Sequence, residues 1–146
     1  ECQWLWQTGR YYHDDVRKLV PEQGGRISVH SFIDRMDLAF AAASVIISRA
    51  GAGTISELCL VGKPVILVPS PNVAEDHQTI NAMALSAKDA AIVVPDSEAA
   101  KRLVSEALKL VTDEGRRITL SGNIIKMAER DADTRIAREV IKLIEG

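Results

Sequence analysis

The sequence lacks most of the residues that mark metal centres, disulfide frameworks and nucleic-acid binding surfaces. Cys2 and Cys59 are its only cysteines, and no CxxC pair or histidine stands at metal-ligand spacing from them. This pattern argues against a bound metal and favours free thiols in a reducing compartment. The formal net charge of −2 supplies no basic surface, so we expect no nucleic-acid partner.

Long apolar runs are absent as well. No segment approaches the length that spans a bilayer, and no signal-peptide layout opens the chain, which fits a cytoplasmic location. What is present is the composition of an ordinary globular domain: 146 residues, 47% of them apolar and 26% charged. Because the chain begins at Glu1 without an initiator methionine, we expect a fragment whose upstream part is absent.

Predicted strands and helices alternate along the chain. Short apolar or alternating runs predict strands at 2–6, 26–30, 45–48, 64–69 and 91–94. Helical spacing of apolar residues predicts helices at 11–20, 35–42 (with Asp34 as N-cap), 54–61 (with Gly62 just past its end), 75–87, 97–111, 114–127 and 134–144. This order predicts an α/β fold, a Rossmann-like, doubly wound parallel sheet with extra helices at the C-terminus.

The stretch from Val45 to Glu57 carries the strongest functional signal. A strand meets a small-residue turn with Gly51 and Gly53, and a helix follows at once. This arrangement aims unpaired backbone N–H groups and the positive end of a helix dipole at an anion. Glycines there permit positive φ and leave room for a phosphate oxygen. A tight turn without ligand is the alternative. The stretch is neither a GxGxxG fingerprint nor a Walker A loop, which disfavours nicotinamide and ATP.

Two explanations of Glu57 follow from the spacing. Thr54 and Glu57 fit a capping box, in which each side chain accepts a hydrogen bond from the other's backbone N–H. Alternatively, Glu57 faces the cleft, where its two carboxylate oxygens suit the vicinal hydroxyls of a ribose. From spacing alone the cap is favoured.

Further polar residues follow a later strand. Gln78 and Asn81 stand three apart on one predicted helix face, so both amides can reach one polar ligand. We expect the segments 32–34, 49–54 and 70–78 to converge on one cleft, because ligands of open parallel sheets bind at the carboxyl ends of strands. No acid–base pair, Ser-His-Asp set or nucleophilic cysteine emerges, so the chain shows a binding site without a recognisable catalytic base.

Four motifs in order resemble the MurG family of UDP-N-acetylglucosamine transferases, in glycosyltransferase family 28. They are Ser31–Met36, Ile47–Leu58, Gly62–Pro69 and Asp76–Ala82, and the resemblance extends over nearly the whole chain. It implies that residues 1–146 form the C-terminal, donor-binding half of a GT-B glycosyltransferase. The N-terminal acceptor domain, and the first strand and glycine-rich loop of this half, would be absent.

The resemblance also implies roles for individual residues. Ile33 would read the uracil through its backbone, with Phe32 beside it, and Glu57 would hold the ribose hydroxyls, against the capping box. Gln78 would contact the sugar, with Asn81 as its neighbour. The turn and helix start would face the diphosphate with Gly51, Ala52, Gly53 and Thr54, and Arg49 would anchor this loop from below. Ile55 and Ser56 complete the donor-binding set.

The implied reaction is inverting transfer of N-acetylglucosamine from UDP to lipid I, which makes lipid II for peptidoglycan. No metal or other cofactor is needed for donor binding. The lipid I acceptor, the membrane contact on the cytoplasmic face of the inner membrane and the general base belong to the missing half, so we expect this chain not to catalyse alone. Two alternatives remain: a stand-alone subunit of the eukaryotic kind that recruits a membrane-bound acceptor subunit, and a non-catalytic nucleotide-binding domain.

Overall fold

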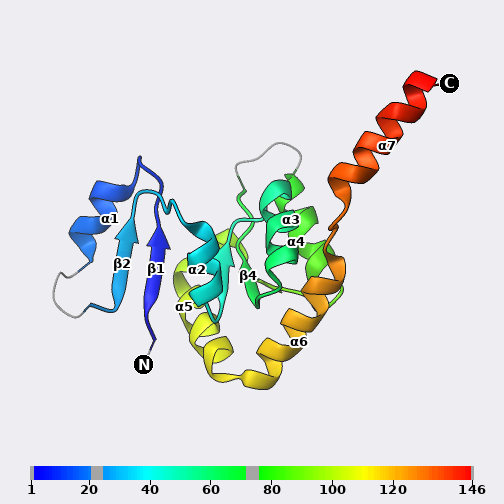
Figure 1. Cartoon of the computed structure of the whole chain (residues 1–146). Helices are drawn as coiled ribbons and strands as arrows, with labels where there is room; N and C mark the ends of the chain where they lie inside the picture. Colours follow the sequence, from blue (N-terminus) through cyan, green and yellow to red (C-terminus); the bar gives the residue numbers. More distant parts are fainter. Residues whose placement is uncertain (1, 21–24, 72–75, 146) are drawn as a thin grey trace. The chain divides into compact units, whose positions relative to one another are not determined.

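The structure is a computed structural model that describes residues 2–20, 25–71 and 76–145. It divides into two compact units, Glu1–Ala43 and Ser44–Gly146. Each unit contains a small parallel sheet with helices in its connections (Figure 1). The expected α/β class with parallel strands is therefore confirmed, although the strands pair as two sheets.

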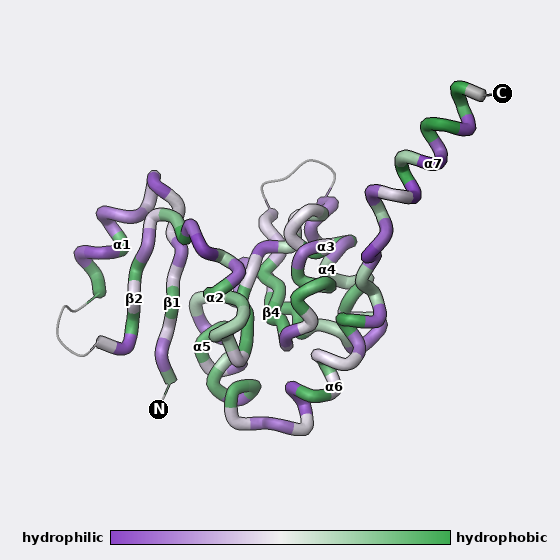
Figure 2. Tube along the Cα trace, in the orientation of Figure 1, coloured by the Kyte–Doolittle hydropathy of each residue, from purple (hydrophilic) through white to green (hydrophobic). Residues whose placement is uncertain are grey.

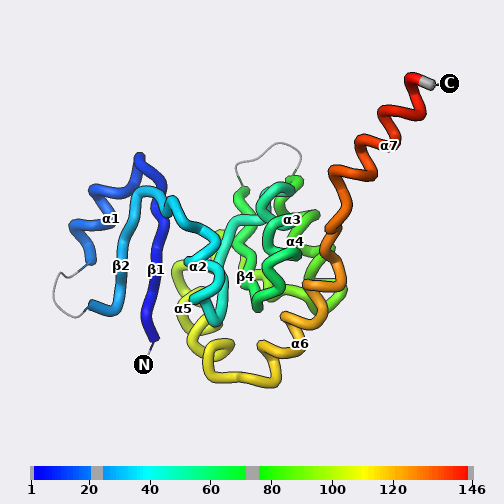
Figure 3. The backbone as a smooth tube through the Cα atoms, in the orientation of Figure 1, coloured from blue at the N-terminus to red at the C-terminus, as the bar shows by residue number. Residues whose placement is uncertain are grey.

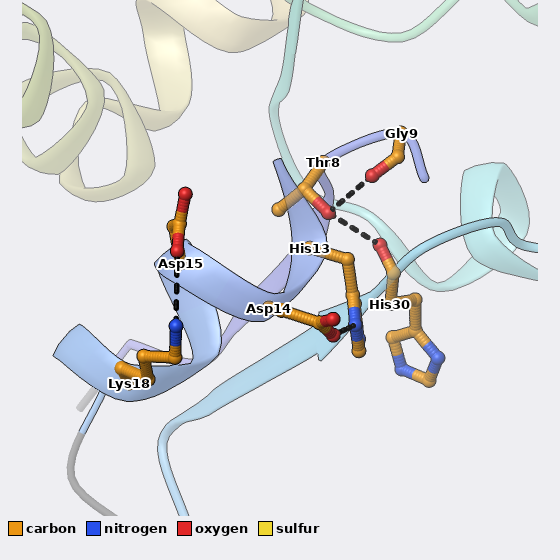
Figure 4. A network of polar contacts seen from close by, with 7 residues as sticks. All are labelled: Thr8, Gly9, His13, Asp14, Asp15, Lys18 and His30. Carbon is orange, nitrogen blue, oxygen red and sulfur yellow. Dashed lines mark hydrogen bonds and ion pairs between the residues drawn. The ribbon is translucent and has the colours of Figure 1, made fainter. Parts of the chain in front are cut away.

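The first unit is built around a strand–helix–strand motif. Strand β1 (Trp4–Gln7) and strand β2 (Ile27–His30) pair in parallel with Trp6 opposite Val29, and helix α1 (His13–Leu19) lies between them in the chain. Just past β1, the Thr8 hydroxyl donates to the His30 carbonyl at 3.2 Å (Figure 4). This bond fastens the carboxyl ends of the two strands to each other.

Helix α2 (Met36–Ala42) completes the first unit and corrects one prediction. Its N-cap is Arg35 rather than Asp34, and no side chain caps it. The Arg35 carbonyl accepts the N–H groups of Leu38 and Ala39 and so starts the helix, which leaves Asp34 one residue too early. Two hydrogen bonds join the Arg35 guanidinium to Asp37, and they lower the pKa of that carboxyl.

The second unit holds a three-stranded parallel sheet in the order β3–β4–β5. Its strands are β3 (Ile46–Ser48), β4 (Val65–Leu67) and β5 (Ile92–Val93). Helix α3 (Ala52–Val61) follows β3, and helix α4 (His77–Ser86) follows β4, as the trace in Figure 3 shows. The chain then continues through α5 (Asp96–Thr112), α6 (Glu114–Ile124), the 3₁₀ turn η2 (Ile125–Met127) and α7 (Ala132–Glu145).

The core of the second unit centres on β4. All three of its residues are fully buried, and Figure 2 shows it among the hydrophobic segments. A strand that is apolar on both faces is typical of the centre of a parallel sheet. The other large side chains that are fully buried come from surrounding elements: Leu58, Val94, Leu120 and Ile124.

Helix α3 ends as predicted. Gly62 takes the left-handed conformation (φ 67°), and its N–H donates to the Leu58 carbonyl at 3.0 Å. The positive φ favours glycine, and a Cβ at this position would lie 2.9 Å from Ile125 Cδ1, so the Ile125 side chain would have to shift. The tight turn brings α3 directly into the buried strand β4.

The C-terminal helix α7 is an amphipathic element whose apolar side chains are exposed. They include Ile136, Val140, Leu143 and Ile144, the stripe that its sequence spacing predicts. Within the described ranges, no helix combines the length and apolar character that crossing a membrane requires.

Candidate functional site

The candidate site lies where the three parallel strands of the second unit end. Ladder bonds continue one residue past β4 and β5, from Val68 N–H to Ser48 O and from Val94 N–H to Leu67 O, both at 2.9 Å. The segments that leave this edge are 49–51 before α3, 68–71 after β4 and 94–95 before α5. Carboxyl ends of strands in open parallel sheets are where ligands bind.

Two side chains of α4 hold the segment between β3 and α3. Ala50 is fully buried, its N–H donates to Gln78 Oε1 at 3.1 Å, and its carbonyl accepts from Asn81 Nδ2 at 3.1 Å. Gln78 Oε1 also accepts the Ser70 N–H at 2.9 Å. The structure thus brings together the predicted segments 49–54 and 70–78, and it does so through the two amides that the sequence singled out.

These bonds fix which way the two amides point. Gln78 Oε1 accepts two backbone N–H groups, so the group that Gln78 can still offer is its Nε2 donor. Asn81 donates through Nδ2, which leaves its Oδ1 as an acceptor. One remaining donor and one remaining acceptor match sugar hydroxyls, each of which can both donate and accept.

The N-terminus of α3 has the features of an anion site. Gly51 is the N-cap in extended conformation, no side chain caps the helix, and its first turn carries no acid. The first N–H groups of such a helix have no intrahelical partner and attract negative charge. A Cβ on Gly53 would meet nothing within 4 Å, so there is open space against the backbone at that point.

Neither glycine of the 51–53 turn adopts the positive φ that the sequence predicts. Among the described glycines, positive φ occurs at Gly9, Gly25 and Gly62, so neither Gly51 nor Gly53 uses the conformational freedom that we predicted for it. The turn is extended at Gly51 and enters the helix at Ala52. The support for a phosphate here is therefore the open space at Gly53, which has no side chain.

The capping-box explanation of Glu57 is wrong. Helix α3 begins at Ala52, two residues earlier than predicted, so Thr54 is its third residue and Glu57 its sixth. Neither residue stands where a capping box requires it. Glu57 is exposed, and no hydrogen bond or ion pair joins its side chain to the part of the chain that the structure describes. It lies four residues from Gly53 and therefore on the same helix face.

The other α3 residues of the predicted set have local roles. Ser56 Oγ donates to the Ala52 carbonyl at 3.1 Å, a bond back along the helix. Thr54 and Ile55 are half-buried. Cys59, further along the helix, is buried, and burial raises the pKa of its thiol, so it is no reactive nucleophile.

Arg49 joins the ends of different strands. Its Nη1 donates to the Val68 carbonyl at 3.2 Å and also to a carboxylate oxygen of Asp96, the first residue of α5. Sequence reasoning missed Asp96. It stands directly behind a strand end, as the other selected segments do, and that position was the available signal.

Phe32 and Ile33 belong to the first unit. The Phe32 side chain is 63% exposed, and the Ile33 N–H donates to Gln7 Oε1 at 2.8 Å. Of the two backbone groups with which Ile33 could read a base, the N–H thus already has a partner in this structure. The expected convergence of this segment with the other two stays a prediction.

No metal centre is built into the described ranges, in which no three His, Cys, Asp or Glu side chains group closely enough to hold an ion. The candidate site offers backbone N–H groups, two oriented amides, the free Glu57 carboxylate, and Arg49 paired with Asp96. This donor set can bind a neutral polar group and an anion next to each other.

Fold and site together define a class: a Rossmann-like α/β domain with a candidate anion site at its strand ends. The model of the glycosyltransferase family 28 C-terminal domain matches residues 1–136. The chain belongs to this family.

Individual relatives agree with this assignment. A protein of Parabacteroides distasonis named UDP-N-acetylglucosamine–N-acetylmuramyl-(pentapeptide) pyrophosphoryl-undecaprenol N-acetylglucosamine transferase is 55% identical over 146 residues, 99% of this chain and 40% of the relative. One of the same name from Bacteroides thetaiotaomicron is 53% identical over 148 residues, 100% of this chain and 40% of the relative.

A solved structure supports the fold. The crystal structure of Acinetobacter baumannii MurG superimposes with a TM-score of 0.83 at 25% identity, over 94% of this chain and 40% of that one. The expected likeness to the C-terminal half of a GT-B enzyme is thus confirmed. The chain spans about 40% of the length of the curated relatives it matches.

Proposed function

We propose that this chain is the donor-binding half of an inverting glycosyltransferase that moves N-acetylglucosamine from UDP to lipid I. The observation that carries the proposal is the uncapped, acid-free start of α3, with open space at Gly53 and the exposed carboxylate of Glu57 one turn further on the same face. The names of the relatives supply the donor and acceptor.

Each part of the donor has a counterpart among these residues. The diphosphate lies against the first N–H groups of α3, at Gly51 to Thr54, where the helix dipole stabilises the charge that grows as UDP leaves. Glu57 accepts hydrogen bonds from the two ribose hydroxyls. Gln78 and Asn81 face the sugar, while Phe32 and Ile33 contact the uracil.

The rest of the reaction belongs to the remainder of the full-length protein. The acceptor C4 hydroxyl attacks the anomeric carbon as the bond to UDP breaks, its proton passes to a base, and the configuration inverts. We place the base, the lipid I site and the contact with the cytoplasmic face of the inner membrane in the N-terminal half. Residues 1–146 then form one donor-binding domain that works without metal or other cofactor.

Calorimetry on the full-length protein tests the proposal. UDP and UDP-N-acetylglucosamine are titrated into the wild type, Glu57→Ala and Glu98→Ala. Glu98 is a half-buried glutamate of α5 that pairs with Arg102 on its own helix. We expect Glu57→Ala to weaken both ligands about tenfold or more, because two hydrogen bonds to a charged group are lost. The melting temperature should not change, since the Glu57 carboxylate has no bond to the described residues.

Three results would contradict the proposal in different ways. Unchanged affinity of Glu57→Ala with a lower melting temperature means that Glu57 is structural and the ribose role is wrong. Tight UDP-N-acetylglucosamine binding by the wild type without turnover in the presence of lipid I would leave only a nucleotide-binding domain. Turnover that requires a separate membrane-bound subunit would identify the stand-alone type.

A further inference from the structure

Arg49 is the residue through which the ends of all three strands in the second unit are connected. It follows β3 in the chain, its guanidinium donates to the carbonyl just past β4, and it pairs with Asp96, which opens α5 two residues after Val94. An arginine suits this position because its planar, multiple donors can serve a carbonyl and a carboxylate at once.

The residue after Arg49 is held from the other side. The N–H and the carbonyl of the buried Ala50 are bound by Gln78 and Asn81 of α4. The dipeptide Arg49–Ala50 is thus fixed by α4 and by α5, one residue before the N-cap of α3. Any movement of this dipeptide would tilt the first N–H groups of α3.

We infer that Asp96 and Arg49 form a positioning pair, which sets the turn 49–51 so that the start of α3 meets the donor diphosphate. Asp96 does so without touching the ligand. This inference rests on the proposed function, because it concerns the same donor site. It assigns Arg49 to the support of the turn and adds Asp96 to the residues on which donor binding depends.

Because the Arg49–Asp96 pair is exposed, we expect it to affect ligand binding more than folding stability. The Arg49 and Asp96 side chains are 56% and 36% exposed, and ion pairs with that much solvent contact add little to folding stability. Binding geometry is more sensitive, because a group misplaced by a fraction of an ångström loses its hydrogen bond. The effect of removing Asp96 should therefore appear in ligand affinity.

The chain contains a matched control for Asp96. Glu98 is also an acid in the first turn of α5, and it also pairs with an arginine, Arg102, but on its own helix. Removing either acid costs α5 the same favourable charge at its N-terminus. Only Asp96→Ala removes the link between Arg49 and α5.

The test uses the full-length protein and two readouts. UDP affinity is measured by calorimetry, and hydrogen exchange of the peptide that covers residues 49–54 is measured without ligand. We expect Asp96→Ala to bind UDP about tenfold more weakly, within the range that members of one hydrogen-bond network show, and to exchange faster in this peptide. Glu98→Ala should match the wild type in both readouts.

A second pair of variants tests whether Asp96 affects UDP affinity through Arg49. Arg49→Lys keeps the charge but loses the planar fork, and Asp96→Ala added to it should cost no further affinity, because both changes break the same link. If Asp96→Ala binds UDP as tightly as the wild type or tighter, the inference is overturned while the proposed function stands. A wild type that binds no UDP overturns the proposed function, and this inference with it.

Discussion

At the scale of single residues, glycine at position 53 lowers helix stability but leaves space for a ligand. Glycine at the second position of α3 weakens a helix, yet a Cβ would meet no atom of the described protein there. The described protein would therefore tolerate a side chain at this position. A phosphate oxygen in the open space would explain why the position holds glycine.

The substitution Gly53→Ala tests this explanation. We expect it to raise the free energy of unfolding by up to about 1 kcal/mol and to weaken UDP binding about tenfold or more. Gly115 is the matched control, because it is the second residue of α6 and its added Cβ would also fit, 3.7 Å from Asp113 Oδ1. Gly115→Ala should stabilise equally and leave affinity unchanged; tighter UDP binding by Gly53→Ala would contradict the phosphate position.

The orientation of Gln78 allows a second test at this scale. Glutamate at position 78 could still accept the N–H groups of Ala50 and Ser70, so the link between the strand ends should survive. It would present an acceptor where Gln78 presents a donor. We expect Gln78→Glu to keep the melting temperature and UDP affinity within about twofold, and to weaken UDP-N-acetylglucosamine about tenfold.

A matched substitution separates the two roles of this side chain. Gln78→Met removes the acceptor as well, so the buried Ala50 N–H loses its partner and the melting temperature should fall. Equal affinity of Gln78→Glu and the wild type for UDP-N-acetylglucosamine would show that the amide faces no sugar group.

At the scale of elements, the turn after α3 has the strictest requirement. Gly62→Ala combines positive φ with a Cβ 2.9 Å from Ile125 Cδ1, and we expect it to lower the free energy of unfolding by about 2 kcal/mol. Gly9→Ala, at φ 75° with nothing within 4 Å, isolates the conformational part and should cost about 1 kcal/mol. Urea unfolding measures both, and equal losses would exclude a steric role for Ile125.

The stabilisation that the ion pair between Arg116 of α6 and Asp89 provides should depend on pH. Two parallel hydrogen bonds, of 2.7 and 2.8 Å, join Arg116 of α6 to the Asp89 carboxylate, and they lower the pKa of Asp89 below its ordinary value of 3.8. Because the pKa is depressed in the folded state, the stabilisation is present above pH 3.8 and is lost as the pH falls through the lowered value.

The variant Asp89→Asn should show this dependence directly. Asparagine tolerates the positive φ of 52° at this position, so the charge is the main change. We expect the variant to be less stable than the wild type at pH 7 and the difference to shrink as urea unfolding is repeated at falling pH. When Arg116→Gln is already present, Asp89→Asn should not lower the free energy of unfolding further. A difference that is constant with pH would exclude the ion pair as its cause.

The order and type of the elements could be predicted from the sequence, because apolar periodicity and breakers such as Gly62 act locally. Helix starts were predictable only in part. The start of α6 at Glu114 matches its prediction. The start of α3 at Ala52 does not, because the backbone turns at an extended Gly51 and no capping side chain marks the start. In the site, residues behind strand ends were predictable from topology. The link between Arg49 and Asp96 was not, because the two are 47 residues apart and meet only when the strands pair.

At the scale of the whole molecule, the proposed function makes this chain the donor-binding half of a sugar-transfer reaction. It spans about 40% of its curated relatives, and the proposed contacts to the donor all lie within it. Sugar transfer also requires the acceptor hydroxyl at attacking distance and a base to take its proton. We assign both to the part of the protein outside this chain.

Residues 1–146 expressed alone should therefore bind UDP-N-acetylglucosamine weakly and transfer no sugar, whereas the full-length protein should do both. Binding is followed by ligand-observed NMR and transfer by mass spectrometry of lipid II. Full-length Glu57→Ala is the control for a protein that is complete but deficient in donor binding. It should still transfer sugar at high donor concentration, because the acceptor site and the base are intact. Transfer by the isolated chain would contradict the division of labour, since it would require a base and an acceptor site among these 146 residues.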